Sequence, residues 1–225
     1  MAAAPNAAPK FEIAVKQSSD GKLGDCPFCH RALLTLEEKN VPYSTTLINF
    51  DAKPDWLLQV NPAGSVPVMK DLANGEWVVD SGVICDFLEK EFPQPALGLV
   101  EESPKIGLDV LPKFAGFIKS GTPEEAAEKE AELVAALGEL DAYLAEHGPF
   151  IGGQQPCSTD LAVWPRLYHM QVTTKYFRGW EMPAQLAHLK AYIDAFTARP
   201  SWQHTLYTPE AIIAGWERHG VKRVV

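Results

Sequence analysis

The chain has 225 residues, of which 46% are hydrophobic and 22% charged, and its formal net charge at pH 7 is −9. This is the composition of a globular protein, and the length suits one large domain or two small ones with a substantial buried core. The acidic balance argues against nucleic acid as a partner, because the lysines and arginines are scattered and form no basic patch for phosphates.

No apolar stretch approaches the ~20 residues that a membrane-spanning helix needs, so we expect no stable membrane insertion. Residues 1–9 are rich in Ala and Pro but lack the basic region and apolar core of a secretory signal. We therefore expect a cytoplasmic protein. An organelle stays open as an alternative if an N-terminal segment has been removed.

The first ninety residues alternate the patterns of strands and helices. Alternating apolar and polar residues predict a half-buried strand over 11–16, and an apolar stripe at helical spacing predicts a helix over 26–40. A strand, a short helix, a turn and two short strands follow, over 42–50, 54–60, 61–64, 66–69 and 77–79. Asp80 and Ser81 begin a further helix. This β-α-β-α-β-β-α order requires a parallel strand pair with a right-handed crossover, and it adds an antiparallel hairpin.

A Pro-rich stretch over 92–98 interrupts this pattern and predicts an interdomain linker. The remainder has helical patterns throughout. Thr122 and Glu125 predict a capping box around Pro123, at the start of a helix whose leucines form one apolar face. The sequence thus predicts an α/β domain over 10–91 and an all-α domain over 99–225.

The chain contains four cysteines, Cys26, Cys29, Cys85 and Cys157. A chain of this size with so few cysteines needs no disulfides to fold, and a lone C-x-x-C motif fits a reducing compartment. No metal is expected, because a zinc site would need a second ligand pair at usable spacing. Cys85 falls on the apolar stripe of its helix, and we assign it to the core.

Cys26 falls where the first predicted helix begins, within GDCPFC over 24–29. Helix starts present unpaired N–H groups and the positive end of the helix dipole, so an anion is stabilised there. A thiol in such a place can have a pKa of roughly 3.5–7.5 and be a thiolate at neutral pH. Pro27 fits the first turn, where its missing donor is not needed. The alternative is an inert buried cysteine, and the motif in this context favours a reactive Cys26.

Three runs of the sequence carry a family resemblance: GDCPFCHRALLTLEEKNVPY at 24–43, NPAGSVPV at 61–68 and VVDSGVI at 78–84. They closely resemble the dehydroascorbate reductases of plants and algae, in the glutathione-transferase superfamily. The resemblance covers nearly the whole chain. It implies that 10–91 is a thioredoxin-like, glutathione-binding domain, that 99–225 is the helical domain of that fold, and that the protein is a monomer.

The resemblance implies a glutathione site. The backbone of Val66, ahead of a cis peptide bond to Pro67, pairs with the cysteinyl part of glutathione. Asp80 and Ser81 hold the γ-glutamyl end, and Lys53 pairs with the glycine carboxylate. Without the resemblance, these residues would be an ordinary edge strand, a plain helix N-cap and a solvated surface lysine.

Lys16 and Asp25 match family positions that contact the second substrate. Lys16 would polarise the oxygens of dehydroascorbate, and Asp25 would accept hydrogen bonds from its hydroxyls. From the residues alone, Lys16 would be a surface residue at the end of a strand.

The implied activity is the reduction of dehydroascorbate to ascorbate, with glutathione as co-substrate and no bound cofactor. The Cys26 thiolate attacks the oxidised substrate and ascorbate leaves; one glutathione then forms a mixed disulfide with the enzyme, and a second releases it. Two alternatives stay open. One is a glutaredoxin-like or omega-type thiol transferase that acts on protein–glutathione disulfides. The other is a non-enzymatic, chloride-intracellular-channel-like protein of the same fold.

The sequence departs from the family pattern at two positions. Cys29 stands where the family generally has Ser, one helical turn after Cys26, so the two sulfurs should lie near each other. It is a candidate resolving thiol, and its alternative is an inert buried residue. Cys157 stands where the family commonly has Ser or Thr, three residues before Asp160. This predicts a weak helix N-cap unless Ser158 serves instead.

Overall fold

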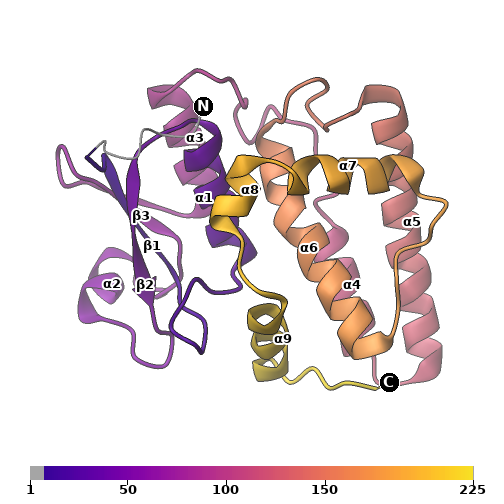
Figure 1. The fold of residues 1–225 in the computed structure, drawn as a ribbon. Helices are drawn as coiled ribbons and strands as arrows, with labels where there is room; N and C mark the ends of the chain where they lie inside the picture. Colours follow the sequence, from indigo (N-terminus) through magenta and orange to yellow (C-terminus); the bar gives the residue numbers. More distant parts are fainter. Residues whose placement is uncertain (1–7, 225) are drawn as a thin grey trace. The chain divides into compact units, whose positions relative to one another are not determined.

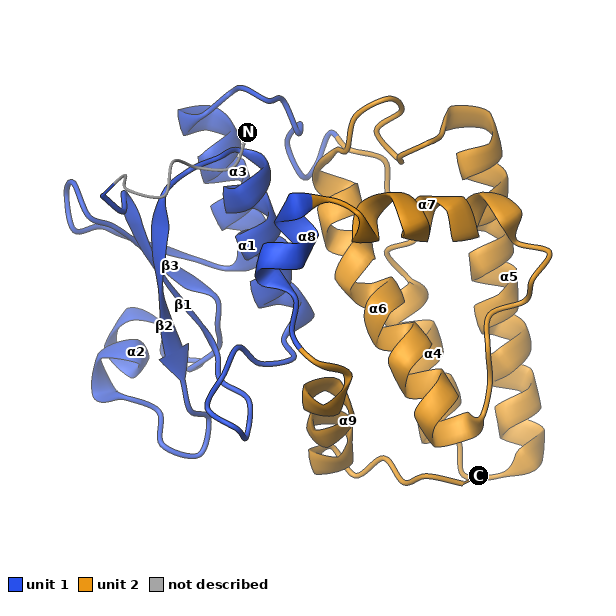
Figure 2. Cartoon of the chain, viewed as in Figure 1, with its two compact units in different colours: residues 1–102, 200–207 blue, residues 103–199, 208–225 orange. Residues whose placement is uncertain are grey.

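A computed structural model describes residues 8–224 of the chain. They form two compact units, shown in different colours in Figure 2. The first unit extends to residue 102 and also includes 200–207, and the second comprises 103–199 and the segment from 208 onward. That residues 10–91 and 99–225 form separate domains stays a prediction.

The first unit is built on a four-stranded sheet with the strand order β2-β1-β3-β4. Its strands are β1 (Phe11–Lys16), β2 (Tyr43–Ile48), β3 (Val68–Asp71) and β4 (Trp77–Val79), and its first helices are α1 (Pro27–Glu38), α2 (Asp55–Val60) and α3 (Ser81–Glu91). β1 pairs with β2 in parallel and with β3 antiparallel, and β3 pairs antiparallel with β4. The predicted element order, the parallel pair and the hairpin are all confirmed.

Helices cover both sides of this sheet, since α1 and α3 pack together on one side and α2 lies on the other (Figure 1). β1 is therefore buried on both faces, with Ile13, Ala14 and Val15 almost completely covered. The alternating sequence of this strand predicted one solvated face. That prediction was wrong, because a central strand between two helical layers is shielded on both sides.

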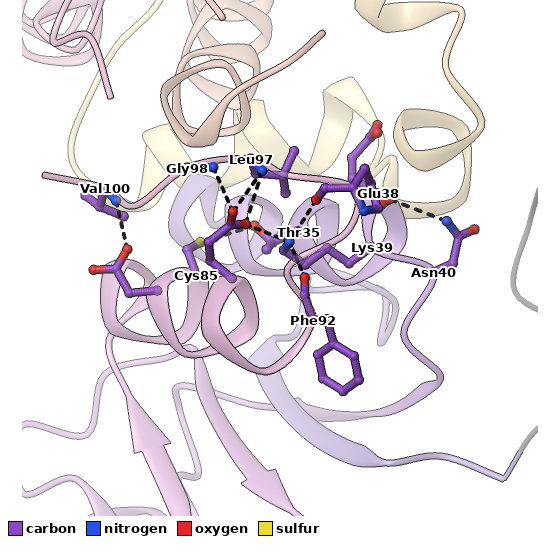
Figure 3. A network of polar contacts seen from close by, with 12 residues as sticks. Thr35, Glu38, Lys39, Asn40, Cys85, Phe92, Leu97, Gly98 and Val100 are labelled. Carbon is purple, nitrogen blue, oxygen red and sulfur yellow. Dashed lines mark hydrogen bonds and ion pairs between the residues drawn. The ribbon is translucent and has the colours of Figure 1, made fainter. Parts of the chain in front are cut away.

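The linker after α3 is fastened to the first unit by a buried ion pair (Figure 3). Lys39, which follows α1, has a fully buried side chain, and its Nζ lies 2.6 Å from Oε2 of Glu89. The same ammonium donates to the carbonyls of Phe92 and Pro95, at 2.7 and 2.9 Å. The Glu89 carboxylate accepts from the N–H of Leu97 at 3.1 Å. These bonds offset the cost of burying the two charges and order the Pro-rich segment against the unit.

The second unit is helical, as predicted. It contains α4 (Val110–Lys119), α5 (Pro123–His147), α6 (Ser158–Arg178), α7 (Ala187–Thr197) and α9 (Pro209–Arg218). α4 packs against α5 and α6, α7 packs mainly against α5, and α9 packs against α6. The short α8 (Pro200–Thr205) belongs to the first unit, where it packs on α1. Across residues 8–224, no helix is both long and apolar enough to span a bilayer.

The N-terminus of α5 differs in detail from the predicted capping box. The hydroxyl of Thr122 accepts from the N–H of Glu125 at 3.2 Å, so the predicted N-cap is confirmed. The Glu125 carboxylate, however, accepts from the N–H of Gly121 at 2.7 Å rather than from that of Thr122. The reciprocal bond therefore closes one residue earlier than in a standard box.

The carboxylate of Asp160 organises the N-terminus of α6. This residue is fully buried, and its two oxygens accept from the N–H groups of Ile151, Gly152 and Cys157 and from the hydroxyl of Tyr192, at 2.7–3.0 Å. The side chain at the N-cap is Cys157, as the sequence indicated. Because Asp160 supplies the strong half of the cap, the poor acceptor at Cys157 does not leave this helix start unsupported.

Candidate active site

The segments that carry the predicted site residues meet at one end of the sheet in the first unit. β1 and β2 end side by side, at Lys16 and Ile48, so the loops that follow them leave from the same edge. β3 begins and β4 ends at this edge too, since Val68 pairs with both Ala14 and Val79. This topology gathers the segments of Lys16, Asp25, Cys26, Lys53, Val66, Asp80 and Ser81.

The loop between β1 and α1 folds back onto the end of β1 at Gly24. The Gly24 N–H donates to the Lys16 carbonyl at 2.8 Å, and a Cβ atom at Gly24 would lie only 2.7 Å from that oxygen. The missing side chain thus brings Asp25 next to Lys16, with Nζ and Oδ1 2.6 Å apart. The two side chains are 16% and 9% exposed. Lys16 is therefore a paired and largely buried residue, not the surface lysine that its position alone suggested.

Cys26 is the N-cap of α1, with an extended backbone and Pro27 in the first turn. Its Sγ accepts from the N–H of Cys29 at 3.4 Å. A hydrogen bond from the Cys29 thiol contributes most to lowering the pKa of Cys26, burial opposes it, and the N–H groups of Cys29 and Phe28 and the charge of Lys16 lower it further. This environment favours a thiolate at Cys26.

Cys29 lies one turn along α1 and is 1% exposed. Burial, followed by the neighbouring Cys26, raises the pKa of the Cys29 thiol well above its ordinary value. Cys29 therefore keeps its proton and donates it toward Cys26. The proximity that the one-turn spacing predicted is present, and a resolving role for Cys29 stays a prediction.

The other two cysteines have environments that do not favour a thiolate. Cys85 is 5% exposed, its Sγ lies 3.1 Å from the Thr35 hydroxyl, and burial raises its pKa. This confirms its assignment to the core. Burial raises the pKa of Cys157 to about 11, with a further contribution from Asp160.

Val66 precedes β3 and is joined to Pro67 by a cis peptide bond. It lies outside the paired residues of the sheet, and no residue within 8–224 forms a hydrogen bond with its N–H or C=O. The residue as a whole is 7% exposed, and what it offers a ligand is its unpaired N–H and C=O. A peptide-like molecule pairs with free backbone groups of this kind.

Asp80 is the N-cap of α3 and has a φ of +81°, which is uncommon for a residue other than Gly. Its Oδ1 accepts from the N–H groups of Gly82 and Val83, at 2.7 and 3.3 Å. Asp80 is exposed, and its Oδ2 receives no hydrogen bond from the described part of the chain. One carboxylate oxygen thus caps the helix while the other stays open to a ligand. The adjacent Ser81 is 3% exposed.

Lys53 follows the turn after β2. Its Nζ lies 4.5 Å from the centroid of the Phe50 ring. Its stem passes Gly64, where a Cβ atom would lie 3.1 Å from the Lys53 Nζ. Among residues 8–224, no carboxylate lies within ion-pair distance of this ammonium, which leaves it suited to an anionic ligand group.

Two neighbours of these residues were missed in the sequence. The ring of Phe50 lies near both Lys16 and Lys53. Arg31 of α1 reaches the start of α3, where its Nη1 would be 3.6 Å from a Cβ atom at Gly82. Arg31 is part of the run at 24–43, but nothing in the spacing predicts which helix start its guanidinium approaches.

Comparisons with known proteins agree with this geometry. The family models described as glutathione S-transferase, N-terminal domain, and glutathione S-transferase, C-terminal domain, match residues 25–91 and 123–195. The chain is 43% identical over 194 residues to "Probable glutathione S-transferase DHAR1, cytosolic" of Oryza sativa subsp. japonica, covering 86% of this chain and 90% of the relative.

Two solved structures are also similar. A crystal structure of Chlamydomonas reinhardtii dehydroascorbate reductase is 44% identical with a TM-score of 0.84, covering 93% of this chain and 98% of that chain. Glutathione transferase Omega 3C from Trametes versicolor is 25% identical with a TM-score of 0.77, covering 95% and 93%.

A thioredoxin-like domain followed by a helical unit is the architecture of the glutathione transferases, which confirms the predicted fold class. Within that class the similarities extend over nearly the whole chain. The chain belongs to the dehydroascorbate-reductase type of the glutathione S-transferase superfamily.

Proposed function

We propose that this protein reduces dehydroascorbate to ascorbate at the expense of two glutathiones, and that Cys26 is the catalytic thiol. The observation that carries the proposal is the environment of Cys26, where a helix N-terminus, the Cys29 donor and Lys16 favour a thiolate. A thiolate is itself a nucleophile, so the protein sulfur, rather than an activated glutathione, attacks first. We also propose a monomer that works in the cytoplasm.

The first half-reaction oxidises Cys26. The thiolate adds to a carbonyl carbon of dehydroascorbate, and the Lys16 ammonium, held by Asp25, stabilises the negative charge that develops on oxygen. A water oxygen then bonds to the sulfur, the carbon–sulfur bond breaks, and its electron pair leaves with ascorbate. Cys26 becomes a sulfenic acid, so the two electrons gained by the substrate come from the sulfur.

The second half-reaction uses two glutathiones. Val66, Asp80, Ser81 and Lys53 bind the first one by its backbone, its γ-glutamyl end and its glycine carboxylate. Its thiolate attacks the Cys26 sulfur and displaces the oxygen as water, which leaves a mixed disulfide. The second glutathione attacks the glutathione sulfur of this disulfide, and glutathione disulfide and the Cys26 thiolate are released.

The experiment is an assay of ascorbate formation by its ultraviolet absorbance, with glutathione and dehydroascorbate as substrates. We expect activity in the wild type and its loss in Cys26→Ser, with an unchanged thermal unfolding midpoint. Cys157→Ser is the matched control, because Cys157 lies in the second unit, and it should keep full activity. Near-normal activity of Cys26→Ser would contradict the proposal.

A second candidate is a thiol transferase that acts on protein–glutathione disulfides. The contact between Cys26 and Cys29 favours it, because paired thiols of this spacing exchange disulfides in thioredoxin-like sites. The rates on dehydroascorbate and on a glutathionylated peptide, measured with the same preparation, separate the two functions. A faster reaction with the peptide would make this second candidate the main activity.

A further inference from the structure

The two lysines that the proposed function assigns to different substrates share one aromatic neighbour. Nζ of Lys16 lies 5.9 Å from the centroid of the Phe50 ring, and Nζ of Lys53 lies 4.5 Å from the same centroid. Both distances are within the ~6 Å over which an ammonium is attracted to an aromatic ring. Lys16 comes from the end of β1 and Lys53 from the segment before α2, so the ring connects two separate parts of the chain.

The position of Phe50 is fixed by its own turn. The Asn49 side-chain oxygen accepts from the N–H of Asp51 at 2.9 Å, and the Asn49 carbonyl accepts from the N–H of Ala52 at 3.1 Å. Both bonds close around Phe50, whose partly buried ring packs against the core of the first unit. The ring is therefore a fixed element against which two long, flexible side chains rest.

The two ammonium groups differ in their other partners. Lys16 forms an ion pair with Asp25, whereas Lys53 has no carboxylate partner within residues 8–224. Two like charges near one ring repel each other, and the negative face of the ring is the feature that offsets this repulsion. The Lys53 side chain is held by the Phe50 ring on its ammonium group and by its packing beside Gly64.

We propose that Phe50 is a positioning residue of the active site, whose aromatic ring orients both the Lys53 proposed to bind glutathione and the Lys16 proposed to bind dehydroascorbate. The inference rests on the proposed function. It adds that the two substrate sites are not independent, because one side chain orients a lysine in each. Phe50 itself touches neither substrate and acts through the two ammonium groups.

The test compares variants at Phe50 that keep or remove the ring. Phe50→Leu keeps an apolar side chain in the core but loses the negative face. It should weaken glutathione binding, measured by calorimetry, about two- to fivefold and lower kcat/KM for dehydroascorbate by a similar factor. Phe50→Trp keeps an aromatic face, so both values should stay close to those of the wild type. Equal effects of Leu and Trp would overturn the inference.

A double-mutant cycle separates positioning from a loss of structure. In a Lys53→Met background, Phe50→Leu should change glutathione affinity no further, because the side chain that the ring positions is already absent. In a Lys16→Met background the same should hold for kcat/KM with dehydroascorbate. Additive losses in both cycles would mean that Phe50 only supports the fold, and the inference would be wrong.

Failure of the proposed function has a different signature. A wild type that binds glutathione but does not reduce dehydroascorbate would remove the function, while the glutathione arm of the cycle would still decide the pairing of Phe50 with Lys53. A wild type that binds neither substrate would overturn both.

Discussion

Asp80 and Asp160 stand near the N-termini of helices in different units, and their carboxylates are used in opposite ways. Asp160 is fully buried, and four donors surround its two oxygens. Asp80 is exposed, holds a strained φ of +81°, and leaves one oxygen without a hydrogen bond from residues 8–224. A saturated carboxylate has nothing left to offer a ligand, whereas one with an open oxygen in a strained conformation does.

The comparison teaches that residue type and local motif do not separate a folding role from a binding role. Both carboxylates accept N–H groups at a helix start, Asp80 as the N-cap of α3 and Asp160 from within the first turn of α6. The sequence indicated the cap at Asp80, whereas for α6 it indicated only a weak N-cap at Cys157 unless Ser158 serves instead. What differs is the number of donors that the rest of the fold supplies to the second oxygen. The comparison can be tested by removing the charge from each residue while keeping its shape.

The largest effect is expected at Asp160. Asp160→Asn replaces an oxygen that accepts backbone hydrogen bonds with an NH₂ group, so buried donors lose their partner. We expect the free energy of unfolding to fall by about 3–5 kcal/mol, measured by urea denaturation. Asp194→Asn on α7 is the control, since its ion pair with Lys190 is exposed and should be worth less than about 0.5 kcal/mol. A similar small loss for both variants would contradict the assignment of Asp160.

At Asp80 the effect should fall on the ligand instead. Asn caps a helix as well as Asp does, so Asp80→Asn should leave the unfolding midpoint nearly unchanged. The open oxygen loses its charge, however, and the KM for glutathione should rise about tenfold or more. Asp80→Ala should show the same rise together with a loss of about 1 kcal/mol in stability. An unchanged KM in both variants would remove Asp80 from the glutathione site.

The comparison extends from carboxylates to the Cys26 thiolate, which is also an anion at a helix start. The Cys29 thiol is the largest cause of the lowered pKa of Cys26, so Cys29→Ala should raise that pKa. The rate of alkylation by iodoacetamide is proportional to the fraction of Cys26 that is a thiolate. The pH at which this rate is half-maximal should therefore rise by about one unit. Cys29→Ser keeps a donor and should move it less. Identical profiles for Ala and Ser would show that the side-chain donor is unimportant.

The smallest effect concerns protection of Cys26 from oxidation. Cys29→Ser should retain most activity. In peroxide, however, it should be inactivated roughly several-fold faster than the wild type, because no neighbouring thiol converts the Cys26 sulfenic acid to a disulfide. When Cys26 is oxidised to a sulfenic acid it carries no charge, so one cause of the raised pKa of Cys29 disappears. Mass spectrometry of the treated wild type should then show a Cys26–Cys29 disulfide. Sulfinic acid at Cys26 without this disulfide, and equal sensitivity of the variant, would leave Cys29 as a buried donor only.

Much of the first unit was predictable from the sequence, because strands, helix starts and turns are local patterns. Cys26 at the start of α1 is the clearest case, since the motif and the helix boundary coincide. The glutathione-site residues were assigned through the family resemblance, and the structure adds that their segments meet at one end of the sheet.

Other features depend on contacts between distant segments and leave no local signal. Lys39 and Glu89 form a buried pair although they lie fifty residues apart in the sequence, and nothing near either one identifies its partner. The burial of β1 on both faces follows from helices elsewhere in the chain. The need for Gly24 follows from the end of β1, eight residues earlier, and the proposed role of Phe50 depends on two lysines from separate segments of the chain.

The Pro-rich segment bound by Lys39 and Glu89, together with the position of α8, has a consequence for how the protein folds during synthesis. A fragment ending at residue 91, where the match to the N-terminal family model ends, would keep both charges but lose the carbonyls of Phe92 and Pro95. Extending it to 102 restores them, yet the buried ring of His30 would still lack the Thr205 hydroxyl, 2.9 Å away. The segment 200–207 leaves the ribosome about a hundred residues after the rest of the first unit. The thiol-bearing unit therefore completes its folding only after residues 200–207 have been synthesised.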